Sequence, residues 1–170
     1  PQPPAPANDD CEDAIFLEDG SSVTGTTVGA TGDPGLTLCE DNFESDLLGV
    51  WYTIEGGGTT RASLCESSYD TQITVYSGAC NNLICVASND QACGPFGDQS
   101  EVVFDTEVSV TYYIYVHGSQ DATGEFELEL LLEISFTDPP TPTPQPPAPA
   151  NDDCEDAIFL EDGSSVTGTT

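Results

Sequence analysis

The first 27 residues of the chain, PQPPAPANDDCEDAIFLEDGSSVTGTT, return without a change at residues 144–170. Such a recurrence sets the size of the folding unit before any other feature is considered. The spacing of 143 residues is long enough for a single domain with its own core. We therefore expect one complete repeat followed by the opening of the next, within a longer tandem array.

The charge balance of the chain is strongly acidic. It contains 31 Asp and Glu residues and a single Lys or Arg, Arg61. A chain of this kind repels nucleic acids and anionic membrane surfaces, so we expect no nucleic-acid partner. No apolar run approaches the roughly 20 residues that span a bilayer, and we expect no membrane insertion.

The cysteines indicate the compartment. Each repeat contains six, because the seventh, Cys154, is the second copy of Cys11. An even number without CxxC pairs or clustered histidines is typical of disulfides rather than of a zinc site, and it predicts an extracellular or cell-surface location. Several connectivities are open. We favour the pairs nearest along the chain, which are Cys11–Cys39, Cys65–Cys80 and Cys85–Cys93.

A proline-rich segment separates the repeats. We assign residues 1–10 to the end of one linker, 11–136 to the repeat domain, 137–153 to the next linker and 154–170 to the start of the next identical repeat. Prolines at this density favour a semi-rigid polyproline II spacer. Thr141 and Thr143 lie between prolines, as in O-glycosylated stalks. Together with Thr137 they are our candidates for covalent glycans, and an unmodified linker is the alternative.

The body of the repeat is predicted to be all-β. Apolar and polar residues alternate along 108–117 and 125–134, which is typical of strands with one buried face. Only residues 11–18 are expected to form a helical turn, capped by Asp9 or Asp10. Eight short strands predict a disulfide-bonded, two-sheet, jelly-roll-like β-sandwich. The six shorter candidate strands are 22–28, 49–55, 59–65, 71–77, 83–88 and 100–105.

Several segments, in this order along the chain, resemble a known group of secreted modules. They are NDDCEDAIFL at 8–17, SSVTGTTVGAT at 21–31, GVWYTIEG at 49–56, SYDTQITVYSGAC at 68–80, CVASNDQACG at 85–94 and TYYIYVHG at 111–118. Together they are similar to the bacterial pre-peptidase C-terminal domain, a jelly-roll-like sandwich appended to secreted enzymes and surface proteins. The resemblance implies an accessory or surface role, sometimes with polymer binding, and no catalysis. This chain differs in placing the module in tandem with itself.

The sequence offers no catalytic constellation. Nucleophilic catalysis needs a base beside the nucleophile, and the only imidazole, His117, falls on the polar face of its predicted strand. A surface histidine is the simpler interpretation there. Neither a GxSxG nor an HExxH motif occurs. We therefore predict that the repeat is not an enzyme.

Calcium is the one cofactor for which the sequence offers ligands. Oxygen-bearing side chains gather on turns in two places, which suits a hard cation. The first group can equally serve as charge at a helix N-terminus, and Asp70 can equally cap a turn. No EF-hand pattern is met. The first group is Asp9, Asp10, Glu12 and Asp13, and the second, which we keep as the calcium candidate, is Asp70, Asn89 and Asp90.

Two further groups are expected on the surface. The glutamates of the last strand are expected to form a solvated face that discourages edge-to-edge aggregation, or a lattice contact neutralised by calcium or a partner's sugar. The outward-facing tyrosines are expected to be ordinary surface residues, or to stack on sugars or neighbouring domains. The glutamates are Glu125, Glu127, Glu129 and Glu133, and the tyrosines are Tyr76, Tyr113 and Tyr115.

These features predict a structural subunit of an extracellular filament, stalk or surface fibre, O-glycosylated and in contact with neighbouring copies of itself. One alternative is an array of polymer- or carbohydrate-binding accessory modules of a secreted hydrolase. Another is a calcium-dependent adhesin. The identity of the two 27-residue copies favours the fibre, because modules tuned to different ligands have no need of identical sequences.

Overall fold

The computed structural model describes residues 3–33, 36, 39, 47–93, 97–120, 122–133 and 162. The chain divides into two units, Pro1–Ser135 and Phe136–Thr170. All the elements below belong to the first unit, and the second contains one described residue, Asp162. The candidate glycosylation sites Thr137, Thr141 and Thr143 lie outside the described residues.

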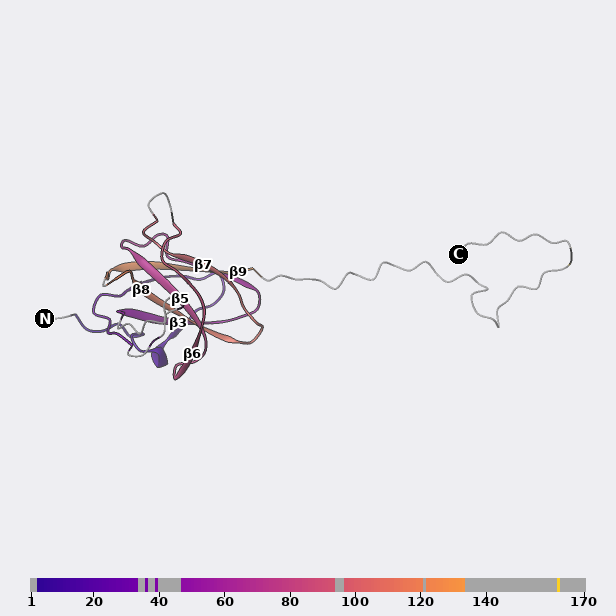
Figure 1. Cartoon of the computed structure of the whole chain (residues 1–170), viewed down its shortest axis with the longest axis horizontal. Coiled ribbons are helices and arrows are strands. Elements are labelled where there is room, and N and C mark those ends of the chain that lie inside the picture. Colours follow the sequence, from indigo (N-terminus) through magenta and orange to yellow (C-terminus); the bar gives the residue numbers. More distant parts are fainter. Residues whose placement is uncertain are drawn as a thin grey trace. The chain divides into compact units, whose positions relative to one another are not determined.

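The first unit is a β-sandwich of two sheets (Figure 1). One sheet has the strand order β1-β3-β8-β5-β6 and the other the order β2-β9-β4-β7. Neighbouring strands are antiparallel except for β1 and β3, which are parallel. The elements are η1 (Cys11–Asp13), β1 (Ile15–Phe16), β2 (Ser22–Thr26), β3 (Gly49–Glu55), β4 (Thr59–Ser63), β5 (Thr71–Ala79), β6 (Asn82–Asn89), β7 (Glu101–Asp105), β8 (Thr111–Gly118) and β9 (Glu125–Glu133).

The prediction of a disulfide-bonded, two-sheet sandwich is confirmed, and each of the eight expected strands is present. The ninth, β1, was missed because two residues are too few for a periodic pattern. The helical turn expected over 11–18 is a single 3₁₀ turn, η1. Asp10 precedes it without a side-chain cap, and the Asp9 carboxylate instead accepts the N–H and the hydroxyl of Thr31, both at 2.7 Å.

The main core fills the space between the sheets. Along β9 the alternation predicted from the sequence is confirmed, since Phe126, Leu128 and Leu130 are at most 4% exposed. They pack with Ile114 and Val116 of β8 in one cluster. Burying an aliphatic or aromatic side chain of this size stabilises the fold by about 1.5–3 kcal/mol.

A second apolar cluster covers the outer face of the five-stranded sheet. Trp51 lies at its centre, with its ring 4.4 Å from that of Tyr115 and 5.8 Å from that of Tyr76. Cys11 and Leu36 complete the buried set. The expectation that Tyr76 and Tyr115 are exposed is therefore wrong, because the outer face of their sheet is covered as well as the inner one. Tyr113 is partly buried against the same cluster.

His117 is also buried, contrary to the surface position expected from its place on the polar face. It is fully buried beside the outer cluster, and its ring stacks on Tyr115 at 4.9 Å. Nε2 lies 3.2 Å from the Thr74 hydroxyl, and Nδ1 lies 3.2 Å from the carbonyl of Gly118. Both ring nitrogens therefore have partners inside the domain.

The disulfides join Cys11 to Cys80, Cys39 to Cys85 and Cys65 to Cys93. None of the three pairs that we favoured from chain proximity is formed. The sheet order places neighbours in space far apart in sequence, and the first pair is separated by 69 residues. Cys80 follows β5 and Cys85 lies in β6, so the first two bridges tie segments near the N-terminus to one hairpin.

We expect from the sequence that the glutamates of β9 discourage edge-to-edge pairing, but the structure does not place them on a sheet edge. β9 lies between β2 and β4 in the middle of its sheet. Glu125 and Glu129 are exposed, and Glu127 accepts a hydrogen bond from the Ser22 hydroxyl at 2.8 Å. Glu125, Glu127 and Glu129 therefore form the expected outward face, but on a central strand and not on an edge.

Candidate functional site

The strand register defines two opposite ends of the domain. β2 and β9 run antiparallel with Thr26 beside Glu125, so the turn after β2 lies next to the start of β9. We call this the lead end; it carries Gly29, Tyr69 and Gly124. At the other end, the N–H of Leu132 donates to the Asp19 carboxylate at 2.7 Å. We call that the exit end.

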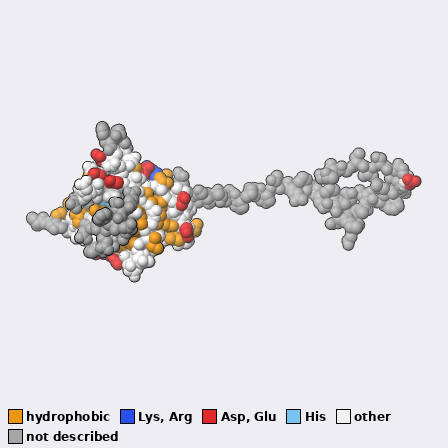
Figure 2. All heavy atoms as spheres, viewed as in Figure 1, with side chains coloured by type: hydrophobic (Ala, Val, Ile, Leu, Met, Phe, Trp, Pro, Cys, Tyr) orange, Lys and Arg blue, Asp and Glu red, His pale blue; other side chains and the backbone are white. Residues whose placement is uncertain are grey.

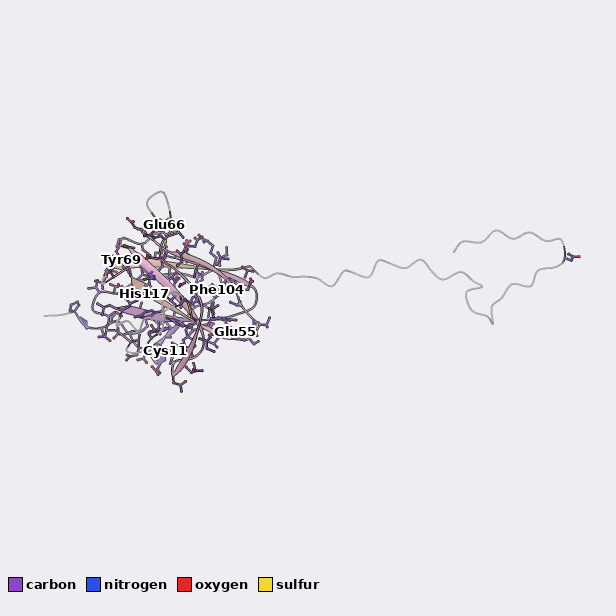
Figure 3. All side chains as sticks on the ribbon, viewed as in Figure 1. Cys11, Glu55, Glu66, Tyr69, Phe104 and His117 are labelled. Atoms are coloured by element: carbon purple, nitrogen blue, oxygen red, sulfur yellow. A yellow bond between two sulfur atoms is a disulfide. The ribbon has the colours of Figure 1, made fainter. Side chains whose placement is uncertain are left out.

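Figure 3 shows the same separation, since Glu55, which lies at the exit end, and Tyr69, which lies at the lead end, are on opposite sides of the domain. The chain therefore finishes β9 at one end, and the turn after β2 lies at the other.

The proline-rich start of the chain, residues 1–8, is called the lead, and its described residues pack against the lead end. A Cβ atom on Gly29 would lie 2.7 Å from the carbonyl oxygen of Pro4 and 3.1 Å from that of Pro3, so only glycine permits this approach. Further along, Asn8 is 6% exposed and exchanges two hydrogen bonds with Trp51 of β3. The Trp51 N–H donates to the Asn8 carbonyl at 2.8 Å, and the Asn8 amide donates back at 2.9 Å. The end of the lead is thus bonded to the domain.

The chain therefore enters the domain at one end and leaves it at the other. The lead passes from Gly29 along β3 and continues into β1, which is parallel to β3. β9 ends at Glu133, beside Thr59 at the exit end. In Figure 1 the indigo start of the domain and the end of β9 are on opposite sides of it.

The exit end contains an apolar pocket of about 240 Å³. Phe16, at its mouth, is 58% exposed, which is unusual for a large aromatic side chain. Three acidic residues, Glu18, Asp19 and Glu55, also line it. Figure 2 shows hydrophobic side chains beside acidic ones on this side of the domain. The apolar lining consists of Phe16, Leu17, Ile54, Leu130 and Leu132.

One polar side chain of the pocket has no partner. Thr60, the second residue of β4, is 3% exposed, and its hydroxyl oxygen makes no hydrogen bond within the protein. Its neighbour Thr59, by contrast, donates to the Asp105 carboxylate at 2.8 Å. A buried hydroxyl left unpaired costs about 1–3 kcal/mol. No sequence signal identified this residue, because threonine is ordinary in a strand.

The calcium candidates lie at the lead end, where the structure brings two of the three together. Asp70 and Asp90 each have one carboxylate oxygen that is inaccessible to solvent and has no partner in the protein. Burial, and then the charges of Asp90 and Asp98, raise the pKa of Asp70. The amide oxygen of Asn89 is engaged differently, accepting the N–H of Glu101 at 3.4 Å.

The described part of the chain contains no group of three or more His, Cys, Asp and Glu residues with an arrangement that could hold a metal ion. Calcium takes about six to eight oxygen ligands. A calcium ion at Asp70 and Asp90 would therefore need backbone carbonyls and water for most of its coordination. In the first group, the Asp9 carboxylate is engaged by the N–H and the hydroxyl of Thr31.

Comparisons with known proteins give two similarities of fold. No protein-family model and no curated protein matches this sequence. Among solved structures, the pre-peptidase C-terminal domain of a collagenase from Bacillus anthracis has a TM-score of 0.43 at 17% identity, covering 69% of this chain and 93% of that one. A periplasmic inhibitor of g-type lysozyme, PliG, from Salmonella Typhimurium has a TM-score of 0.39 at 7% identity, covering 71% and 98%.

The first of these similar structures carries the name of the domain family that the sequence motifs resemble. Both share less than a fifth of their residues with this chain. Among the described residues, no helix has the length and apolar character needed to cross a membrane.

The buried His117 predicts a loss of stability in acid. Burial lowers its pKa to about 4 in the folded domain from the ordinary 6.5. Between these values the unfolded chain binds more protons, so the free energy of unfolding falls as the pH falls from about 6.5 to about 4. The full loss is about 3 kcal/mol. Urea unfolding at several pH values, compared with His117→Gln, should show this component only in the natural protein. Parallel pH profiles for the two proteins would contradict it.

Proposed function

We propose that this protein is a structural subunit of an extracellular filament, stalk or surface fibre, built from tandem copies of the β-sandwich. The observation that carries the proposal is the opposition of the lead end and the exit end. Because the chain enters each sandwich at one end and leaves at the other, successive copies extend a line instead of folding back. We propose that the domain has no catalytic activity of its own.

The sequence supports the same function. A 27-residue segment that recurs without a change provides each copy with the same proline-rich lead, including Pro3, Pro4 and Asn8 of the first copy. The one basic residue, Arg61, is ion-paired with Glu101, so nearly all the carboxylates are uncompensated. High like charge keeps a long chain hydrated and discourages collapse onto its neighbours. We propose that glycans on Thr137, Thr141 and Thr143 add to this hydration.

The carbohydrate-binding alternative has less support than the fibre. It relied on three outward-facing tyrosines for stacking on sugar rings. Tyr76 and Tyr115 are at most 1% exposed, and Tyr113 is partly buried beside them. No other observation on the domain favours sugar binding over self-association.

Calcium-dependent adhesion remains the second candidate, and one observation favours it. Asp70 and Asp90 each have a carboxylate oxygen that is inaccessible to solvent and has no hydrogen-bond partner. Two neighbouring carboxylates repel each other when both are charged, and a bound cation would relieve this repulsion. Both residues lie at the lead end, where copies of the domain would meet in a line. In this alternative the ion would link or stiffen adjacent copies, and assembly would require it.

Electron microscopy of the native protein, with and without the chelator EGTA, tests both candidates. We expect regular filaments with a constant axial repeat that is unchanged by the chelator. Isolated flexible beads under both conditions would overturn the fibre. Filaments that dissolve with EGTA and re-form with added calcium would favour the adhesin.

The variant Asp70→Asn provides the matched control for the calcium outcome. If calcium at this pair is the assembly switch, the variant should form no filaments at any calcium concentration. If the fibre needs no ion, the variant should assemble as the natural protein does, with and without EGTA.

A further inference from the structure

The pocket at the exit end leaves apolar surface uncovered and one buried polar group without a hydrogen bond. Its lining is apolar, yet its mouth is open beside Phe16, which is 58% exposed. The Thr60 hydroxyl is buried there without a partner. Native domains rarely leave a buried hydroxyl unpaired, and one of the recognised reasons is a missing ligand or ion. The pocket therefore calls for an occupant that is apolar and offers a hydrogen-bonding group.

The volume of the pocket limits the kind of occupant. At about 240 Å³ it is smaller than the roughly 300–1,000 Å³ of typical small-molecule sites. A few side chains of another polypeptide fit such a space better than a substrate or cofactor does. Phe16 at the mouth adds an aromatic surface, and aromatic-lined grooves are the usual receptors of proline-rich segments.

The acidic residues around the pocket further limit which polypeptide segment can occupy it. Glu18, Asp19 and Glu55 are among the residues that line the pocket, and their negative charges disfavour an acidic partner. In a chain with 31 acidic residues and one basic residue, few exposed segments are free of negative charge. The proline-rich lead is such a segment, since residues 1–7, PQPPAPA, contain no charged side chain.

The geometry of the lead suits this role. It is seated on its own domain through the backbone, with the carbonyls of Pro3 and Pro4 against Gly29. The side chains of Pro3, Pro4 and Ala5 are exposed. Among the described hydrogen bonds, the only carbonyl of Pro3–Ala7 that accepts one is that of Pro6, from the N–H of Asp9 at 3.3 Å. The other carbonyls of this segment can accept a hydrogen bond from a partner. The Thr60 hydroxyl is a donor without an acceptor.

We propose that the exit-end pocket of one copy of the repeat binds the proline-rich lead, Pro3–Ala7, of another copy. This inference rests on the proposed fibre and specifies its contact. The lead and the pocket lie at opposite ends of the domain, so the contact is head-to-tail. A heterologous contact of this kind does not close on itself in a straight array and generates an open filament. The prolines insert beside Phe16, and Thr60 donates to a lead carbonyl.

Photo-crosslinking identifies the occupant directly. The full protein is made with p-benzoylphenylalanine in place of Phe16, irradiated, digested with a Glu-specific protease and analysed by mass spectrometry. We expect the main product to join position 16 to a peptide containing PQPPAPA. The matched control carries the same crosslinker in place of Val108, which is 77% exposed at the same end and outside the pocket. Crosslinks to other segments, or equal yields from both positions, would overturn the proposal.

Two substitutions test the contact without unfolding the domain. Phe16→Ser removes an exposed side chain and should weaken assembly about tenfold or more, measured as the critical concentration for filaments. Thr60→Val keeps the shape of the side chain and removes the unpaired hydroxyl. It should leave the thermal midpoint unchanged or raised while weakening assembly about threefold to tenfold. Val108→Ser should leave assembly unchanged. An unaltered critical concentration in both pocket variants would refute the contact.

The outcomes separate this inference from the proposed function. Filaments that persist with the same axial repeat in Phe16→Ser, and show no crosslink to the lead, leave the fibre intact and remove the docking contact. A specific crosslink in a protein that forms no filament removes the fibre and retains the contact as local pairing between copies.

Discussion

Replacing both Cys11 and Cys80 with serine should lower the free energy of unfolding by about 4 kcal/mol, because the bridge closes a 69-residue loop. The loss should be accompanied by a change around Trp51, since Cys11 is part of the cluster that covers it. Trp51 is the only tryptophan of the chain, so its fluorescence reports on this cluster alone. We expect a red-shifted emission in the variant under native conditions, followed by unfolding at lower urea concentration.

The double variant Cys65→Ser/Cys93→Ser is the matched control. Its bridge closes a 28-residue loop, for which the expected loss is about 3.5 kcal/mol. It does not touch the outer cluster, so the emission of Trp51 should stay native until the domain unfolds. All variants should also carry Cys154→Ser, so that the extra cysteine cannot exchange with the bridges. A native emission spectrum in the Cys11/Cys80 variant would show that this bridge does not hold the cover in place.

Replacing Trp51 with alanine should cost about 3–5 kcal/mol, among the largest effects of any single substitution in the domain. Its side chain is fully buried between the rings of Tyr76 and Tyr115. Its indole N–H also donates to the Asp33 carboxylate at 2.7 Å. Partial burial of this carboxylate raises the pKa of Asp33. The measurement is the free energy of unfolding in urea, followed by circular dichroism.

Trp51→Phe separates the two contributions. Phenylalanine keeps much of the ring packing and removes the N–H donor to Asp33, so the expected loss is about 1–3 kcal/mol. Val108→Ala, at an exposed position, should change stability by less than about 0.5 kcal/mol. If the alanine and phenylalanine variants lose the same amount, the hydrogen bond and not the packing dominates at this position.

The strands could be predicted because their information is local. Alternation along β8 and β9 places Ile114, Val116, Phe126 and Leu128 on one face, and a face of four apolar side chains is stable only when buried. Turn residues between the apolar runs separate eight of the nine described strands. β1 escaped the prediction because its two residues follow from pairing with Tyr52 and Thr53 rather than from any pattern of their own.

The candidate sites depended on contacts that local patterns do not encode. Asp70 and Asp90 were chosen from the sequence as oxygen ligands, and the fold does bring their charges together. Thr60 gave no signal, since its lack of a partner arises only when β3, β4 and β9 meet around the pocket. The lead looked like linker by composition, yet Asn8 pairs with a strand 43 residues away.

The sequence by itself determined the recurrence of the 27-residue segment, the all-β class, the charge and the presence of six cysteines in residues 11–93, because these depend on composition and short-range periodicity. Only the tertiary structure decided which cysteines pair, that His117 and Tyr115 are buried, and that the chain enters and leaves at opposite ends. The physical reason is that alternation states which side of a strand a residue is on, but not what lies over that side. The disulfide-bonded segments that cover the outer face come from distant parts of the chain, and only their packing shows it.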